Sequence, residues 1–207
     1  MRLAGTVAAA ACVAALTSCA HHASRTHVAT DPWWAFVHTP TPVPTLSLAP
    51  RALFAGTYET AKAPRQLTFD LTADAVWTGA GETADGFALR LGTATMRVYE
   101  LPAGATTVSR ILDTLRRTPG LTRSADEVTK PVDGHDAWHL TWHVTAPVRV
   151  VVGGVPLTFR TGELDHAIVV AAPAAPLLVL MAAPDRWGFD TVYEEGHKVV
   201  FSMRIGR

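Results

Sequence analysis

Three regularly spaced histidines are the first residues in this sequence that could do chemistry. His135, His139 and His143 stand four residues apart, and histidine is a common ligand of Zn²⁺. On a helix this spacing would place the three imidazoles on one face, where they could share a metal ion. The segment instead opens with Asp133-Gly134 and contains Trp, Thr and Val, which favour a strand. On a strand, positions four apart lie about 13 Å from each other, so the pattern predicts a half-buried strand with polar residues outward and no metal site.

The other histidines show no ligand spacing. His166 and His197 fall on other predicted elements, far from the first three in the sequence. A further group, His21, His22 and His27, lies in a segment with no predicted fold and could bind a metal only weakly. We therefore expect no resident metal and no cofactor.

Patterns typical of enzymes are absent from the sequence. It contains no G-x-S-x-G, H-E-x-x-H, P-loop or G-x-G-x-x-G motif. His135-Asp136 and Asp165-His166 are adjacent pairs on predicted strands, so the two side chains of each pair point to opposite faces. Glu194-Glu195 are expected on the solvated face of the last helix. The sequence predicts that the protein is not an enzyme.

Cys19 belongs to a motif for covalent modification. Met1-Arg2 precedes an apolar run from Leu3 to Leu16, which is too short to span a bilayer core of ~30 Å and is typical of a signal peptide. The run ends in Leu16, Thr17, Ser18 and Cys19, which resemble the lipobox of bacterial lipoproteins. That resemblance implies cleavage after residue 18 and a diacylglycerol on the Cys19 thiol. It also implies a location at the outer face of the cytoplasmic membrane.

Residues 19–65 are predicted to form a proline-rich tether between the lipid and a folded domain. The prolines, at 32, 40, 42, 44, 50 and 64, favour extended backbone. An apolar island interrupts the tether at Trp33, Trp34 and Phe36. These aromatic side chains either dock on the folded domain, lie at the membrane interface or bind a partner protein.

Residues 66–207 have the patterns of a globular domain. Apolar residues alternate in several segments, as they do in strands, and the residues from Val108 to Leu115 follow a helical period. Thr78–Glu82 is predicted to be a loop. Asp185–Ile205 fits both a helical and a strand period, and we predict a helix. The fold class is therefore α+β, with an antiparallel sheet of about six strands flanked by helices.

The stretch Val132-Asp133-Gly134-His135-Asp136-Ala137-Trp138 resembles the "G-x-x-A" turn and strand of PsbP-like domains. Ala183-Pro184, Phe189 and the closing Val200-Phe201-Ser202-Met203-Arg204 are similar to that superfamily's C-terminal region. Within the superfamily, the chain most resembles actinobacterial lipoproteins of the LpqN/LpqT type. The resemblance implies an α/β/α sandwich and a non-enzymatic, extracytoplasmic role in binding or assembly. No functional residue can be transferred, because no site motif matches.

Charge and hydropathy limit the partners. The chain carries 18 Lys and Arg against 18 Asp and Glu, which excludes the basic face of a nucleic-acid-binding protein. We expect contact with the membrane through the lipid anchor, and an envelope protein as partner. The alternative is a carrier of a lipid or another apolar ligand, because Leu177–Met181 is apolar on both strand faces. Such a segment is either a cavity wall or, more commonly, a central strand covered on both sides.

Overall fold

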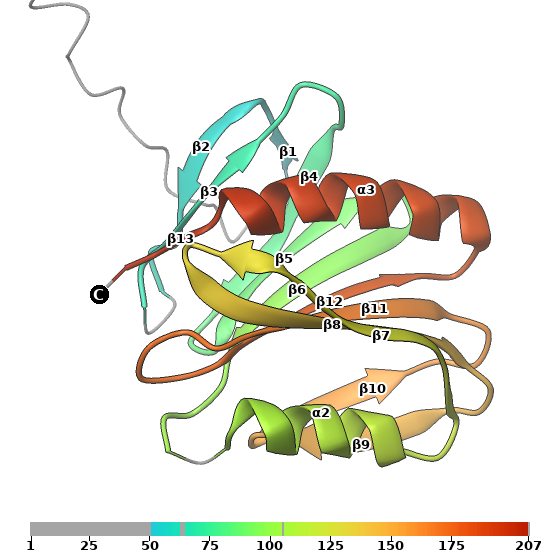
Figure 1. Cartoon of the computed structure of the whole chain (residues 1–207). Coiled ribbons are helices and arrows are strands. Elements are labelled where there is room, and N and C mark those ends of the chain that lie inside the picture. The colour runs from blue at the N-terminus through green and yellow to red at the C-terminus, as the bar shows by residue number, and fades with distance from the viewer. Residues whose placement is uncertain (1–50, 63–64, 105, 207) are drawn as a thin grey trace, which may run out of the picture. The chain divides into compact units, whose positions relative to one another are not determined.

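A computed structural model describes residues 51–62, 65–104 and 106–206, except for the side chains of 125–128. Within these residues the largest unit is an eight-stranded antiparallel sheet in the order β1-β4-β5-β6-β12-β11-β8-β7 (Figure 1). Its strands, in that order, are Ala52–Leu53, Trp77–Thr83, Gly86–Leu91, Ala94–Glu100, Leu177–Ala183, Leu164–Val170, His135–Val144 and Leu121–Val132. The prediction of about six strands was too low. The glycine-rich Thr78–Glu82 is part of strand β4 rather than a loop, and β1 pairs with β4 beyond it.

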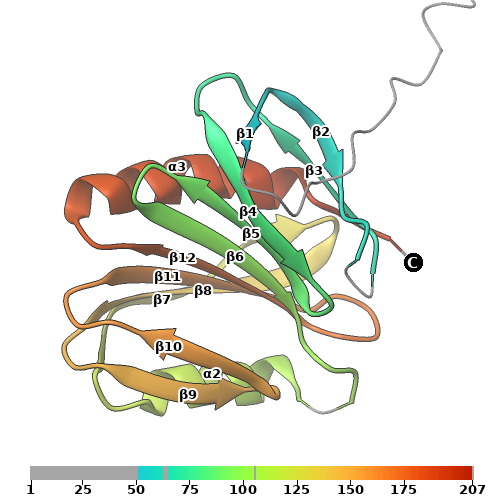
Figure 2. The ribbon, with the colours of Figure 1, turned by 180° about the vertical axis from the view of Figure 1, so that it is seen from behind.

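Both faces of the sheet are covered, as Figures 1 and 2 show. Helix α3 (Arg186–Ser202) packs on one face. Helix α2 (Val108–Arg117) and the hairpin of β9 (Val148–Val152) and β10 (Val155–Phe159) pack on the other. The antiparallel sheet with helices on both sides agrees with the predicted fold class, and the hairpin adds a second small layer beside α2.

Strand β12 lies in the middle of the sheet and contributes to both cores. Leu177, Val179 and Met181 are buried in the core under α3. Leu178 and Leu180 are buried in the core under α2 and the hairpin. Apolar residues on both faces therefore belong to a covered central strand. The structure supports a covered central strand, and Leu180 also borders the cleft described below.

The folded part begins earlier than residue 66. Strand β1 and strand β2 (Gly56–Glu59) both lie within the range predicted to be a tether. Strand β2 pairs with β3 (Leu67–Leu71), which pairs in turn with β13 (Arg204–Ile205). Leu53 and Tyr58 are buried, because these short strands carry apolar side chains into the main core. The predicted boundary at residue 65 was wrong for this stretch, whereas residues 19–50 lie outside the described residues.

Local sequence signals set the ends of both helices. The Thr107 hydroxyl accepts a hydrogen bond from the Arg110 amide (3.3 Å) at the start of α2, as expected for an N-cap. The Asp185 carboxylate accepts from the Gly188 amide (2.7 Å) at the start of α3. The C-terminal segment is a helix, as predicted, and turns into a strand only at Arg204–Ile205.

Strand β7 forms one edge of the large sheet and is irregular. Its register against β8 shifts twice, between Arg123 and Ala125 and between Thr129 and Val132. The turn into β8 has left-handed backbone at Asp133 (φ 48°) and Gly134 (φ 78°), as a tight hairpin turn requires. The Asp133 carboxylate also accepts a hydrogen bond from the Ile205 amide (2.7 Å), which connects this turn to the end of the chain.

Candidate functional site

The residues predicted to carry the lipid and to touch membrane or partner lie outside the described residues. These are Leu16, Thr17, Ser18, Cys19, Trp33, Trp34 and Phe36, together with the group His21, His22 and His27. The lipid anchor and the aromatic island therefore stay predictions. Within the described part of the chain, no helix combines the length and apolar character that crossing a bilayer requires.

The three evenly spaced histidines lie on strand β8, as predicted, but they differ in burial. His143 is exposed and His135 is half-buried, whereas His139 is only 8% exposed. The expectation of an outward polar face is wrong at His139, because α3 covers this face of the sheet. The prediction for Glu195 is wrong for a similar reason, since its side chain is buried and paired with Lys198 (2.7 Å).

A cleft of about 480 Å³ opens on the side of the sheet that carries α2 and the β9–β10 hairpin. Its size is within the usual range for small-molecule sites. Five strands or their ends contribute to it, together with the loop after β10. The residues that carry its polar chemistry are Arg90, Thr93, Thr95, Arg97, Thr158, Arg160, Glu163 and Asp165. Phe159, Leu180 and Pro184 supply apolar walls.

Strand register places the cleft residues side by side. Asp165 on β11 is paired with Ala182 on β12, Ala182 with Thr95 on β6, and Thr95 with Arg90 on β5. Directly paired residues share one face of a sheet, so these four side chains form a row across four strands. Arg97 stands two residues beyond Thr95 on the same face. The Ala182 side chain, in the middle of this row, is only a methyl group, so it leaves space in the cleft between Asp165 and Thr95.

Asp165 is the most unusual residue of the cleft. Asp165 is only 1% exposed to solvent. Its Oδ2 atom has no hydrogen-bond partner among the described residues. The pKa of the Asp165 carboxyl is raised from 3.8 to about 8, mainly by burial and in part by the nearby Glu163 carboxylate, while the Arg97 guanidinium opposes the rise. At neutral pH the group is therefore mainly a neutral acid, which can donate a hydrogen bond.

The arrangement is suited to binding a small anion. Arg90, Arg97 and Arg160 bring three guanidinium groups to the cleft, and Glu163 and Asp165 bring the two carboxyl groups. Guanidinium groups hold carboxylates and phosphates through paired hydrogen bonds. A protonated Asp165 adds a donor at the buried end. The apolar walls can cover a compact body attached to the anion.

No sequence motif predicted this site. Asp165 was assigned only to a predicted strand, and no chemical role was predicted for Arg97. The two are 68 positions apart in the sequence, and only the register of β6, β12 and β11 brings them to one cleft. An aspartate within an apolar strand, Asp165 before Ala167–Val170, is the one local signal that could have drawn attention to it.

No protein-family model matches the chain, and no curated protein matches it significantly. Similar solved structures include cyanobacterial PsbP of Synechocystis, with 16% identity, 74% of this chain and 94% of that chain covered, and a TM-score of 0.42. LpqN of Mycobacterium tuberculosis, described as involved in cell envelope biogenesis, has 12% identity, 81% and 100% coverage, and a TM-score of 0.32. A protein from Bacteroides thetaiotaomicron has 10% identity and a TM-score of 0.40. The match covers 68% of this chain but only 45% of the Bacteroides protein.

Proposed function

We propose that this chain is a non-enzymatic, lipid-anchored binding module of the cell envelope whose cleft beside Asp165 binds a small anionic ligand. The ligand class is a carboxylate or phosphate joined to a compact, partly apolar body. Cys19 carries the lipid, the domain stands at the outer face of the cytoplasmic membrane, and an envelope protein is its partner. The anchor part of this proposal rests on the leader and lipobox residues, and PsbP-like membership rests on the resemblance of residues 132–138.

One observation carries the ligand proposal. The Asp165 carboxyl is buried at the wall of the cleft, and its Oδ2 has no hydrogen-bond partner among the described residues. A buried polar atom without a partner costs about 1–3 kcal/mol. A ligand that accepts a hydrogen bond from this carboxyl removes that cost on binding. The cleft's arginines favour an acceptor that carries negative charge.

Binding fits the cleft better than catalysis does. The polar lining has a single buried ionisable group, Asp165, and arginines that hold charge without exchanging protons at neutral pH. General acid–base catalysis needs groups that lose and regain a proton at the reacting atom. Positive charge with hydroxyl and apolar walls serves recognition, so we assign a binding role.

Native mass spectrometry of the full-length protein in detergent tests the proposal. Two probes carry the same phosphate: glycerol 3-phosphate, a free small anion, and dioctanoyl phosphatidic acid, a lipid. We expect a one-to-one complex with at least one of them. Binding of both would identify the phosphate as the feature recognised, and binding of the lipid alone would show that the apolar walls are needed.

Arg97→Gln and Arg204→Gln form a matched pair for this experiment. Arg97 lines the cleft, whereas Arg204 lies on β13 in the small three-stranded sheet and pairs with Asp70 (3.5 Å). Loss of one charged hydrogen bond costs about 1.5–3 kcal/mol, so Arg97→Gln should weaken binding at least ~10-fold and Arg204→Gln should leave it unchanged. Equal affinity in the two variants, or no complex with either probe, would overturn the assignment of the cleft.

A further inference from the structure

Three histidines from three different elements meet on the other face of the sheet, under α3. His139 comes from β8, His166 from β11 and His197 from α3. One ring nitrogen from each lies within 4.8 Å of the other two. The ring centres of His139 and His166 are 5.1 Å apart, and those of His166 and His197 are 5.0 Å apart. This group, the histidine cluster, lies on the face of β11 opposite to the anion cleft.

Register explains why the cluster forms. His166 is paired with Thr141 on β8, two residues from His139 on the same face. Diagonal neighbours of this kind in an antiparallel pair lie within reach of long side chains. Helix α3 packs on this face, with Tyr193 and His197 one turn apart. The Tyr193 ring lies 4.8 Å from that of His166 and 4.2 Å from that of His197, so it closes one side of the cluster.

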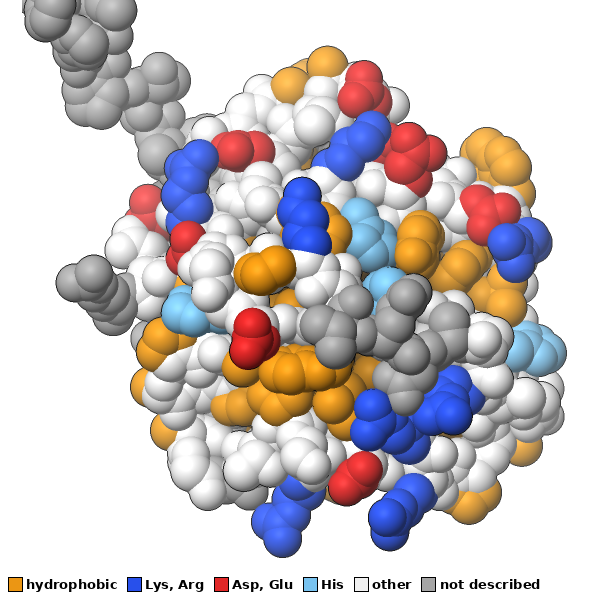
Figure 3. All heavy atoms as spheres, in the orientation of Figure 1, with side chains coloured by type: hydrophobic (Ala, Val, Ile, Leu, Met, Phe, Trp, Pro, Cys, Tyr) orange, Lys and Arg blue, Asp and Glu red, His pale blue; other side chains and the backbone are white. Residues whose placement is uncertain are grey.

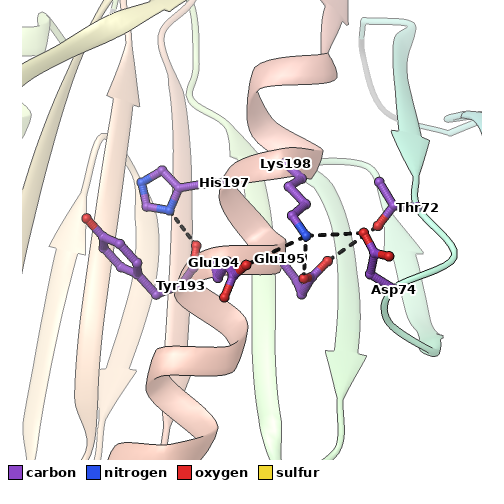
Figure 4. A network of polar contacts seen from close by, with 7 residues as sticks. All are labelled: Thr72, Asp74, Tyr193, Glu194, Glu195, His197 and Lys198. Atoms are coloured by element: carbon purple, nitrogen blue, oxygen red, sulfur yellow. Dashed lines mark hydrogen bonds and ion pairs between the residues drawn. The ribbon is translucent and has the colours of Figure 1, made fainter.

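Two of the rings are held through their Nδ1 atoms. The Thr141 hydroxyl lies 2.8 Å from His166 Nδ1. His197 Nδ1 contacts the carbonyl oxygen of Tyr193 at 2.5 Å (Figure 4), and because a carbonyl only accepts, this Nδ1 carries the proton. Nε2 of His197 is then a lone-pair donor. Metal-binding histidines are typically fixed in this way, with one nitrogen on an outer oxygen and the other toward the metal.

His166 points to a ligand most directly. It is fully buried, and its Nε2 atom has no hydrogen-bond partner in the described part of the chain. Its Nδ1 is already engaged with Thr141, so Nε2 is the atom left to face the cluster. A buried ring nitrogen in this position needs a partner, because its desolvation is otherwise uncompensated.

We propose that His139, His166 and His197 form a Zn²⁺ site with three protein ligands and an open fourth position. Neutral imidazole is a good ligand for Zn²⁺, and three histidines with one open position are a known zinc geometry. Bonds of about 2.0–2.1 Å require ligand nitrogens about 3.3 Å apart in a tetrahedron. The three ring nitrogens now lie up to 4.8 Å apart, so the rings tilt inward when the ion binds.

The cluster has a route to solvent. His197 is half-buried, in contrast to His166. Figure 3 shows histidine side chains reaching the surface among hydrophobic ones on the face that carries α3. A metal ion can enter from that side and keep a water or a small anion in the fourth position. The site is separate from the anion cleft, so either proposal can fail without the other.

The test uses the full-length protein with His21, His22 and His27 changed to Gln, which removes the competing group near the N-terminus. Zn²⁺ content after equilibrium dialysis and the visible spectrum with Co²⁺ are measured. We expect one ion per chain and the intense absorption of tetrahedral Co²⁺. His197→Gln should lose both, whereas His143→Gln, an exposed residue on the same β8 strand, should retain both.

Two further measurements keep the result independent of folding defects. Zn²⁺ should raise the Tm of the parent chain, because an ion that binds only the folded state stabilises it, and should not raise the Tm of His197→Gln. Thr141→Val, which removes only the hydroxyl at His166 Nδ1, should weaken Co²⁺ binding about 10–100-fold. Less than one ion per chain, an octahedral Co²⁺ spectrum, or equal binding by His197→Gln and the parent would show a histidine core that holds no metal.

Discussion

Asp165 and His166 are neighbours in the chain, yet their side chains enter opposite cores of the same sheet. Asp165 lines the cleft on the side of the β9–β10 hairpin, and His166 lies under α3 with its ring 5.0 Å from that of His197. Strand alternation produces this division. One strand, β11, thus supplies a buried polar group to each of the two candidate sites.

Asp165→Asn should change how stability depends on pH. The carboxyl has a pKa of about 8 in the fold against 3.8 in the unfolded chain. Its contribution is therefore fully present below about pH 4 and is lost as the pH rises to 8. Relative to Asp165→Asn, the wild type should lose up to about 1.4 kcal/mol of unfolding free energy per pH unit in that window.

Urea denaturation of metal-free protein at pH 5 and pH 8 measures this difference. Burial also lowers the pKa of His166, from 6.5 to about 2, so its stabilising effect is present above pH 6.5 and is lost in acid. Because His166 is present in both proteins, its effect cancels in the comparison. Parallel pH profiles for the wild type and Asp165→Asn would contradict the raised pKa of Asp165.

Two glycines at the ends of β5 should respond very differently to alanine. A Cβ on Gly86 (φ 152°) would lie 1.8 Å from the carbonyl oxygen of Val98 on β6, and that backbone atom cannot move without breaking the strand pair. A Cβ on Gly92 (φ 59°) would have no atom within 4 Å of it. Gly86→Ala should cost about 2–4 kcal/mol of unfolding free energy, and Gly92→Ala about 1 kcal/mol. Chemical denaturation checks the order, and a Gly92→Ala cost equal to or above that of Gly86→Ala would refute the steric argument.

The Lys198 ammonium should stabilise the fold because it neutralises the carboxylate of Glu195. It lies 2.7 Å from Glu195, whose side chain is buried, and 3.3 Å from the exposed Asp74. Figure 4 shows the three side chains between α3 and the loop after β3. Lys198→Met leaves a buried charge without a counter-ion, whereas Asp74→Asn removes only an exposed contact. We expect a clearly lower Tm for Lys198→Met and a small change for Asp74→Asn. Equal Tm losses would mean that Glu195 does not depend on Lys198.

Cys19→Ala tests the proposed anchor. The mature wild-type protein should begin at Cys19 and carry the added mass of a diacylglycerol, with palmitate label incorporated in cells. The substituted protein has no thiol at the lipobox position to receive the lipid and should incorporate none. Ser24→Ala is a matched control just beyond the motif and should be labelled like the wild type. Equal palmitate label in Cys19→Ala would refute the lipobox assignment.

Local signals predicted most of the elements. The apolar stripe from Val108 to Leu115 was sufficient to predict α2. Asp133-Gly134 placed the β7–β8 turn. In each case the interactions that form the element join residues within about ten positions of one another, so the local sequence pattern is enough to predict the element. Strands β1 and β4 were missed because their pairing, not their composition, makes them strands.

The two candidate sites depend on contacts that no local pattern encodes. His139 is separated from His197 by 58 positions. The predicted strand carrying His135, His139 and His143 is present, and strand spacing was the argument against a metal shared among those three. The same reasoning could not detect that β11 and α3 bring His166 and His197 to His139. The spacing of residues along one strand can be read from the sequence. Which residues of neighbouring strands lie side by side depends on the strand register.

The irregular strand β7 has a consequence for the proposed anchor, which would hold copies of the protein at high local concentration on a membrane. A long, regular edge strand exposes unpaired amide and carbonyl groups on which another chain can build a further strand. The two register shifts of β7 and Pro131 within it disrupt that row of groups, and at the opposite edge β1 has only two residues. Among the described residues, neither edge of the large sheet offers a long, regular template for edge-to-edge aggregation. We therefore expect that copies brought together by the proposed anchor do not form intermolecular β-sheet.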